Sequence, residues 1–241
     1  MSRLRWQPVG LIVVVLMLWA CSDARSLEVE NMSSKQAEAL LAEAIQEGDQ
    51  ARMEQLIQAG VDVNATNKAG TSMLMWAFFS QRLPEFKRLL AEGADPTIQD
   101  DNGKTVIHYA AALNSIDYLE VLLAEGVPVD IESELGATPL FEAIGDNPRR
   151  VDLLLQHGAD VNHQDVMGNT PLHIAAAVND YDSLLKLLHR GADPRLKNKQ
   201  GATFQNALAT GPAEEVYTQK GQQQRNTFRQ WLRDHDVEVT F

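Results

Sequence analysis

The residues of this chain that could carry out chemistry are six histidines, one cysteine and 33 acidic residues. Their spacing forms no His-Glu-x-x-His metal motif, no Gly-x-Ser-x-Gly nucleophile motif, no phosphate-binding glycine loop and no cysteine pair. His163 and His235 stand isolated in the sequence. We therefore expect no enzyme, no metal, no cofactor and no small-molecule substrate, and alanine at His163 and nearby Asp165 is the test of the enzymatic alternative.

The acidic residues follow a regular spacing that favours a structural role over acid–base catalysis. Four aspartates recur after a Gly-x pair, at the same place in successive copies of a longer pattern: Asp62, Asp95, Asp160 and Asp193. Aspartate side chains accept hydrogen bonds from nearby backbone N–H groups in turns. We expect these carboxylates to hold turns.

The single cysteine, Cys21, follows a three-part leader. Arg3 and Arg5 supply positive charge, and residues 9–19 form an apolar run that is shorter than the roughly 20 residues needed to span a bilayer. Residues 1–20 are thus predicted to be a secretory signal, cleaved after Ala20. Residues 18–21 resemble the bacterial lipobox, which implies a lipid-modified Cys21 followed by a tether over residues 21–32. An incidental cysteine behind an ordinary signal peptide is the alternative.

The residue after the cysteine bears on localisation. Ser22 stands where lipoproteins retained in the inner membrane usually carry aspartate, so the resemblance favours the outer membrane, facing the periplasm. Asp23, one position later, leaves the inner membrane open. A lipid anchor of several acyl chains would hold the chain stably at the membrane.

The elements that must position all these residues are revealed by two series of glycines. The first series opens successive copies of a repeat, spaced 33, 33, 32 and 33 residues apart: Gly70, Gly103, Gly136, Gly168 and Gly201. The second closes the copies: Gly60, Gly93, Gly126, Gly158 and Gly191. Such a period indicates a solenoid of stacked units, with glycine in turns that need positive φ.

Each copy predicts two helices. Thr138 and Thr170 are predicted N-caps, with Pro139 and Pro171 at the first helical position. Leu172, Ala175 and Ala176 are predicted to face inward. The first helices are predicted to end in left-handed caps at Gly48, Gln81, Asn114, Asn147 and Asn179. The second helices carry paired leucines: Leu89–Leu90, Leu122–Leu123, Leu154–Leu155 and Leu187–Leu188.

These copies resemble ankyrin repeats. The family's Thr-Pro-Leu-His-x-Ala core is complete at residues 170–175, close at 138–143, where Phe141 replaces histidine, and looser at 105–110 and 72–77. The resemblance implies an all-α solenoid of about six helix-turn-helix units with short hairpin loops, over residues 33–241, and usually a protein-binding role. It also implies that His108 and His173 bond a neighbouring hairpin and the motif threonine.

Both ends of the array are expected to be capping repeats with polar outer faces. A first helix is predicted over residues 37–47 and a last one over about 213–235. In the last helix, residues 222–225 are expected to be solvated, while Phe228, Trp231 and Leu232 pack back onto the stack.

A partner is expected to bind the hairpin tips and the exposed ends of the first helices, as the resemblance implies. The residues in that register are Lys68, Phe79, Asn102, Lys104, Glu134, Leu135, Val166, Met167 and Val178. Consecutive apolar residues at exposed tips suggest a covered interface. In the alternative, these side chains tuck between neighbouring tips.

The net charge of −12 makes a nucleic-acid partner unfavourable. We hypothesise a non-enzymatic lipoprotein of the bacterial envelope that binds, sequesters or inhibits an unidentified protein partner through its concave face. One alternative is an immunity protein that neutralises a toxic enzyme delivered to the periplasm. Another is an accessory scaffold for an envelope or stress-defence enzyme.

Overall fold

The computed structural model describes residues 32–113, 115–145, 147–209 and 218–241, and within them the chain is all-helical. The predicted signal segment, Cys21 and residues 21–31 of the predicted tether therefore lie outside the described residues. The helices are α2 (Ser34–Glu47), α3 (Gln50–Gln58), α4 (Met73–Phe79), α5 (Leu83–Ala91), α6 (Val106–Ala112), α7 (Asp117–Ala124), α8 (Pro139–Ala143), α9 (Pro148–Gln156), α10 (Pro171–Ala177), α11 (Tyr181–His189), α12 (Phe204–Ala209) and α13 (Gln219–Asp234).

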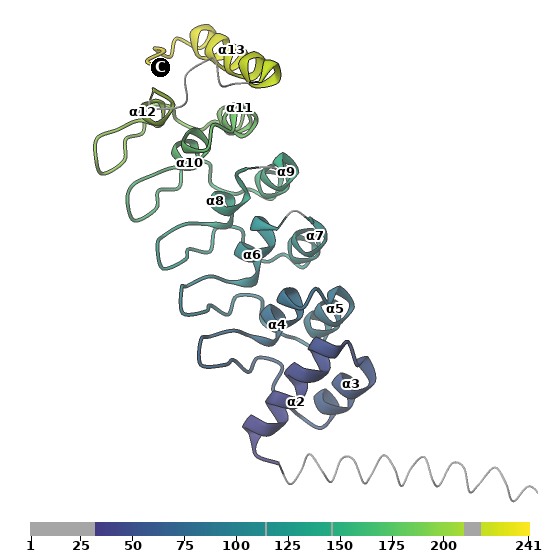
Figure 1. Ribbon diagram of the computed structural model, residues 1–241. Coiled ribbons are helices and arrows are strands. Elements are labelled where there is room, and N and C mark those ends of the chain that lie inside the picture. Colours follow the sequence, from purple (N-terminus) through teal and green to yellow (C-terminus); the bar gives the residue numbers. More distant parts are fainter. Residues whose placement is uncertain (1–31, 114, 146, 210–217) are drawn as a thin grey trace, which may run out of the picture.

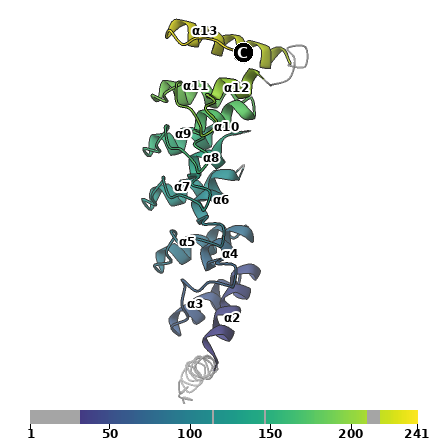
Figure 2. The same cartoon turned by 90° about the vertical axis from the view of Figure 1, so that its left-hand side faces the viewer.

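The helices form pairs that stack into one long array (Figure 1). The first helices, α4, α6, α8, α10 and α12, form an inner row, and the second helices, α5, α7, α9 and α11, form an outer row. A hairpin precedes each inner helix and projects away from the outer row. The view turned by 90° shows the same linear order, with α13 across the C-terminal end (Figure 2).

The inner helices begin where the sequence predicts. Thr138 and Thr170 are N-caps with extended backbone, and Pro139 and Pro171 are the first helical residues. Proline suits that position because its missing N–H would have no partner in the first turn. At Thr170 the backbone N–H donates to Nδ1 of His173, the third helical residue, at 3.1 Å, whereas Phe141 at the equivalent position after Thr138 has no such acceptor.

The ends of the inner helices confirm the predicted left-handed caps at three positions and correct one. Gly48, Gln81 and Asn179 have φ of 75°, 56° and 57°, whereas Asn114 lies outside the described residues. Asn147 was wrongly predicted to be such a cap: its φ is −119° and it is the N-cap of α9. The fourth copy is one residue short, so α8 ends after only five residues and Gly145 supplies the positive φ.

The core lies between the two rows of helices. The first leucine of each predicted pair is completely buried: Leu89, Leu122, Leu154 and Leu187. Alanines of the inner row are also fully buried, among them Ala110 and Ala175, and their small side chains let the helices approach closely. Replacing one of these leucines with alanine would cost about 2–5 kcal/mol.

The C-terminal cap differs in part from the prediction. Phe228 and Leu232 of α13 are fully buried, as expected, and Phe228 packs against Phe204. Arg225 was expected to be solvated but is buried, because its guanidinium lies 5.6 Å from the ring centroid of Phe241. α13 begins at Gln219, later than the predicted start, and residues 210–217 lie outside the described residues.

His235 was expected to be isolated, but it is the C-cap of α13, and its ring stacks on Trp231 at 3.9 Å. Among the residues that the structure describes, no helix has the length and apolarity required to cross a lipid bilayer.

Candidate protein-binding face

The hairpin tips are tight turns, each fixed by its first residue. In the turn of residues 100–103, one carboxylate oxygen of Asp100 accepts N–H groups of Asn102 and Lys104 at 2.8 and 3.0 Å. One side-chain oxygen each of Asn67, Asp165 and Asn198 likewise accepts two backbone N–H groups of its own turn. The side chain of Ser133 makes a single hydrogen bond in its turn, in which its Oγ accepts the N–H of Ala137.

The last residue of each tip turn is one of the first glycine series, and each has the positive φ that the sequence predicts. At Gly103 the chain also needs the missing side chain, because a Cβ there would lie 2.4 Å from the backbone nitrogen of Glu134. The tips are therefore packed backbone against backbone.

Backbone hydrogen bonds link each tip to the next. The N–H of Glu134 donates to the carbonyl of Asn102 at 2.9 Å, and the N–H of Val166 donates to the carbonyl of Leu135 at 3.0 Å. Lys199 continues the series by donating to Met167 at 2.9 Å. These bonds set the tips in a fixed register, so the side chains at equivalent turn positions form rows along the stack.

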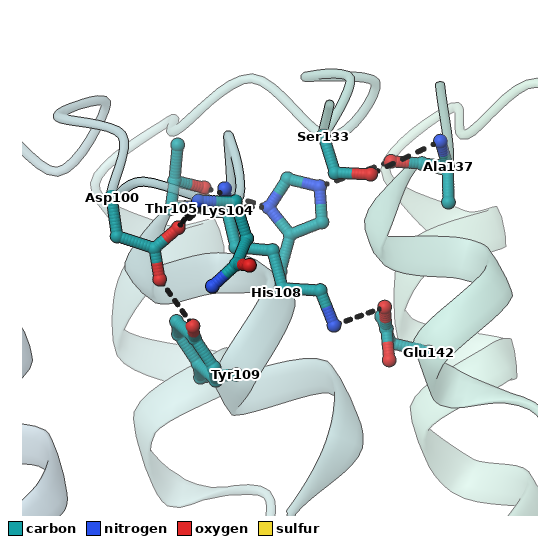
Figure 3. Close-up of polar contacts among 9 residues, drawn as sticks. Asp100, Lys104, Thr105, His108, Tyr109, Ser133, Ala137 and Glu142 are labelled. Carbon is teal, nitrogen blue, oxygen red and sulfur yellow. Dashed lines mark hydrogen bonds and ion pairs between the residues drawn. The ribbon is translucent and has the colours of Figure 1, made fainter. Parts of the chain in front are cut away.

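His108 connects two repeats, as expected (Figure 3). Its Nδ1 accepts the backbone N–H of Thr105 at 3.1 Å, and its Nε2 donates to the carbonyl of Ala137 in the next hairpin at 3.2 Å. Burial lowers the pKa of His108, which favours the neutral ring that this arrangement requires. His173 makes the equivalent bonds to Thr170 and to Ala202. Both rings are structural bridges.

The fourth repeat lacks the motif histidine, and His163 makes a different bridge. The Nε2 of His163 donates to the carbonyl of Gly136 at 2.8 Å, and its ring packs edge-on against Phe141 at 6.0 Å. His163 was expected to be isolated, and this interpretation was wrong, because the hairpins bring together positions 27 residues apart. The buried hydroxyl of Thr138, which has no hydrogen-bond partner, marks the site of the missing histidine.

A polar cluster lies where the hairpins meet the inner helices (Figure 3). The hydroxyl of Tyr109 donates to Asp100, and the Nζ of Lys104 pairs with Glu142 at 2.8 Å. Burial raises the pKa of Tyr109 to about 12, and the hydrogen bond to Asp100 adds to this. Burial alone would raise the pKa of Asp100, but the bonds from Tyr109 and from backbone N–H groups outweigh it and lower the pKa.

This cluster supplies binding groups rather than an activated nucleophile, because Tyr109 keeps its proton and Asp100 is fully engaged in the turn. Among the described residues, no group of three or more His, Cys, Asp or Glu could hold a metal ion.

Sequence reasoning missed Tyr109 and Glu142. Both occupy the variable position of the six-residue motif, the one before its final alanine, which is half-buried in four successive copies: Trp76, Tyr109, Glu142 and Ile174. That shared register was the signal that could have found them. Phe79 packs edge-on against Tyr109 at 5.0 Å, which joins a predicted residue to the missed row.

The structure places the predicted partner-binding residues in the hairpins or at the ends of the inner helices. Lys68, Asn102 and Glu134 are exposed at tips, and Lys104 is half-buried beside Glu142. The exposed large apolar side chains of the described residues are Phe79 (50%), Leu135 (68%), Val166 (45%), Met167 (48%) and Val178 (57%). The apolar tip residues are thus exposed to solvent rather than tucked between neighbouring tips. Val178 is the C-cap of α10.

Comparison with known families identifies the array. A sequence model described as ankyrin repeats matches three overlapping stretches, residues 41–133, 80–165 and 122–198. The chain belongs to the ankyrin repeat family. Ankyrin repeats are protein-binding modules, so protein binding is the general function that this family membership indicates.

Curated relatives match over short stretches. Human oxysterol-binding protein-related protein 1 is 60% identical over 40 residues, which are 17% of this chain and 4% of the relative. Mouse ankyrin repeat domain-containing protein 37 is 46% identical over 52 residues, 22% of this chain and 33% of the relative. The ankyrin chain thus spans a third or less of these relatives.

A solved structure matches over most of the array. It is described as a predatory endopeptidase from Bdellovibrio bacteriovorus in complex with an immunity protein. The similarity has a TM-score of 0.64 and 26% sequence identity, and it covers 78% of this chain and 97% of the matched chain.

Proposed function

We propose that this ankyrin protein is a non-enzymatic inhibitor that binds a protein partner through its hairpin tips and inner helices. The observation that carries the proposal is the placement of exposed apolar side chains. Phe79, Leu135, Val166, Met167 and Val178 all lie at tips or at the ends of inner helices. Exposed apolar residues gathered on one side are a feature of interaction sites.

The finer proposal is an immunity function in which the partner is an endopeptidase. Its support is the similarity, over almost the full length of the matched chain, to a structure that contains an endopeptidase and an immunity protein. An array whose described residues include no metal cluster and no activated nucleophile suits this role, because inhibition requires only that the array cover a surface of the endopeptidase.

We also propose that Cys21 carries a lipid and holds the array in the envelope, facing the periplasm. The support is the leader of residues 1–20 and the position of the single cysteine. Radiolabelled palmitate should enter the wild-type chain and not Cys21→Ala. Equal labelling of the two proteins would contradict the lipid anchor and would leave the proposed binding function standing.

The inhibitory function can be tested with the full chain solubilised in detergent from the cells that encode it. Proteins that co-purify would be assayed for peptidase activity before and after the chain is removed. We expect activity to appear on removal and to disappear when purified chain is added back in equimolar amount.

Deletion of the gene completes this test. Cells without the chain should lose viability when the captured endopeptidase is produced in their periplasm. Unimpaired survival would contradict the immunity function, and a partner whose activity falls without the chain would indicate the accessory scaffold.

A further inference from the structure

Each hairpin tip presents two central residues, and the ladder of backbone bonds aligns them in two rows. The first row reads Lys68, Asp101, Glu134, Val166 and Lys199, and the second reads Ala69, Asn102, Leu135, Met167 and Gln200. All these residues are exposed. The central six, which we name the tip ridge, are Asp101, Asn102, Glu134, Leu135, Val166 and Met167.

The tip ridge is rigid before any partner arrives. Its backbone is tied by the bonds from Glu134 to Asn102 at 2.9 Å and from Val166 to Leu135 at 3.0 Å. Gly103 and Gly136 hold neighbouring tips within direct backbone contact. Little backbone freedom is therefore lost on binding, which raises the affinity that a given set of contacts can provide.

The carboxylates of the tip ridge differ from those beneath it. Asp100 and Asp165 are hydrogen-bonded within their own turns, where each carboxylate accepts two backbone N–H groups. Asp101 and Glu134 form no ion pair with any residue that the structure describes. Two carboxylates thus face solvent next to three exposed apolar side chains.

The outer helices show that this arrangement is specific to the tips. There, acidic residues pair with basic ones on the neighbouring second helix: Glu54 with Arg88 at 3.1 Å, Glu120 with Arg149 at 3.0 Å, and Asp152 with Lys186. In a protein with net charge −12, these pairs neutralise part of the outer face, whereas the two carboxylates of the tip ridge have no such pair among the described residues, and the lysines of that row lie at its two ends, Lys68 and Lys199. Such a surface repels anionic lipids and nucleic acids.

The geometry points to the tip ridge as the centre of the partner contact, and to a partner surface that sets Arg or Lys side chains beside an apolar recess. The cationic groups would face Asp101 and Glu134, and Leu135, Val166 and Met167 would enter the recess. Opposite charges steer the encounter and fix its register, while the desolvated apolar side chains supply the affinity. This inference rests on the proposed function, because it names the partner chemistry of the same face.

Site-specific photo-cross-linking in the cells that encode the full chain tests the location. Benzoylphenylalanine would replace Leu135, Met167, Phe79 or Val178. Gln200, at the same turn position on the fifth tip, and Ala124, at the end of α7, are the matched controls. We expect one discrete protein adduct from Leu135 and Met167, and none from the two controls, Gln200 and Ala124.

The outcomes separate the two proposals. Adducts from Phe79 or Val178 without any from the tip ridge would overturn this inference and leave the proposed function standing. A folded chain that gives no adduct at any of these positions would overturn both. An adduct with the mass of a second copy of this chain would contradict a basic, apolar partner.

Charge reversal tests the chemistry, with the protein recovered from the adduct as the probe. The double variant Asp101→Lys/Glu134→Lys should lower the association rate constant at low salt by about tenfold, and high salt should narrow the difference. Glu125→Lys, on the exposed C-cap of α7, is the control and should leave the rate unchanged. Equal rates for all three proteins would refute the predicted cationic surface.

Discussion

The two long faces of this array are built from the same repeat but differ in their ion pairs and in their exposed apolar side chains. On the outer face, consecutive second helices neutralise each other through pairs such as Arg88–Glu54 and Arg149–Glu120. At the tips, Leu135, Val166 and Met167 are exposed beside Asp101 and Glu134, which form no ion pair with the part of the chain that the structure describes. The difference indicates that the outer face satisfies many of its charges with its own ion pairs, whereas the exposed apolar side chains of the tips are the proposed contact for a second protein.

The histidine bridges beneath the tips allow a large predicted effect on stability. His173→Ala should lower the free energy of unfolding by about 3 kcal/mol, because the N–H of Thr170 and the carbonyl of Ala202 lose their buried partner. His163 is less buried, and its single bond to Gly136 should be worth about 1 kcal/mol. Urea denaturation of both variants would check the order, and a larger loss for His163→Ala would contradict it.

Two glycines offer a matched pair across the two faces. Gly103→Ala should cost about 3 kcal/mol or more, because its strained φ is combined with a Cβ 2.4 Å from the backbone of Glu134. Gly93→Ala, at the end of α5, has similar φ but open space, so strain alone should cost about 1–2 kcal/mol.

Partner binding sharpens this comparison. Gly103→Ala should weaken partner affinity because it displaces the tips, and Gly93→Ala should not. Titration of each folded variant against the captured partner would show it, and parallel losses of affinity would mean that the tips have no special part in binding.

The buried histidine predicts a pH dependence of stability. Burial lowers the pKa of His108 in the folded chain below its unfolded value of 6.5, so the unfolded state binds the proton more readily. The stability that neutral His108 contributes is full above pH 6.5 and is lost as the pH falls through the folded pKa. Urea midpoints between pH 7.5 and 5 should fall less steeply in His108→Gln, and identical slopes would argue against this origin.

The outer ion pairs predict the smallest effect. Arg149 is about two-thirds exposed, so Arg149→Ala should change the free energy of unfolding by less than about 1 kcal/mol. Partner affinity should stay the same, since the proposed interface lies at the tips and not on the outer face. Urea denaturation would check the stability and a calorimetric titration against the captured partner the affinity, and a clear loss of affinity would place part of the interface on the outer helices.

The repeat pattern was enough to predict the fold. The two glycine series, the threonine caps and the leucine pairs each constrain local structure, and a solenoid is assembled almost entirely from neighbouring units. The exposure of Leu135, Val166 and Met167 was predictable for the same reason, because their register in the turn sets their position.

The failures lie where the chain departs from the repeat. Asn147 was assigned by register although the fourth copy is one residue short, which moves the left-handed position to Gly145. His163 and Arg225 were judged from their own neighbours in sequence, but their partners, Gly136 and Phe241, come from other segments. Tyr109 and Glu142 were missed because the motif treats their position as variable, so the motif does not specify which side chain stands there.

The affinity of the captured partner for the full chain carrying Leu135→Asp/Met167→Asp tests the central claim most directly. The matched control is Ala124→Asp/Gln156→Asp, which places the same charges on exposed positions of the outer helices α7 and α9. We predict that the dissociation constant rises at least about 100-fold for the tip variant and stays within about twofold for the control. An unchanged dissociation constant for the tip variant, or the same rise in both, would contradict the account.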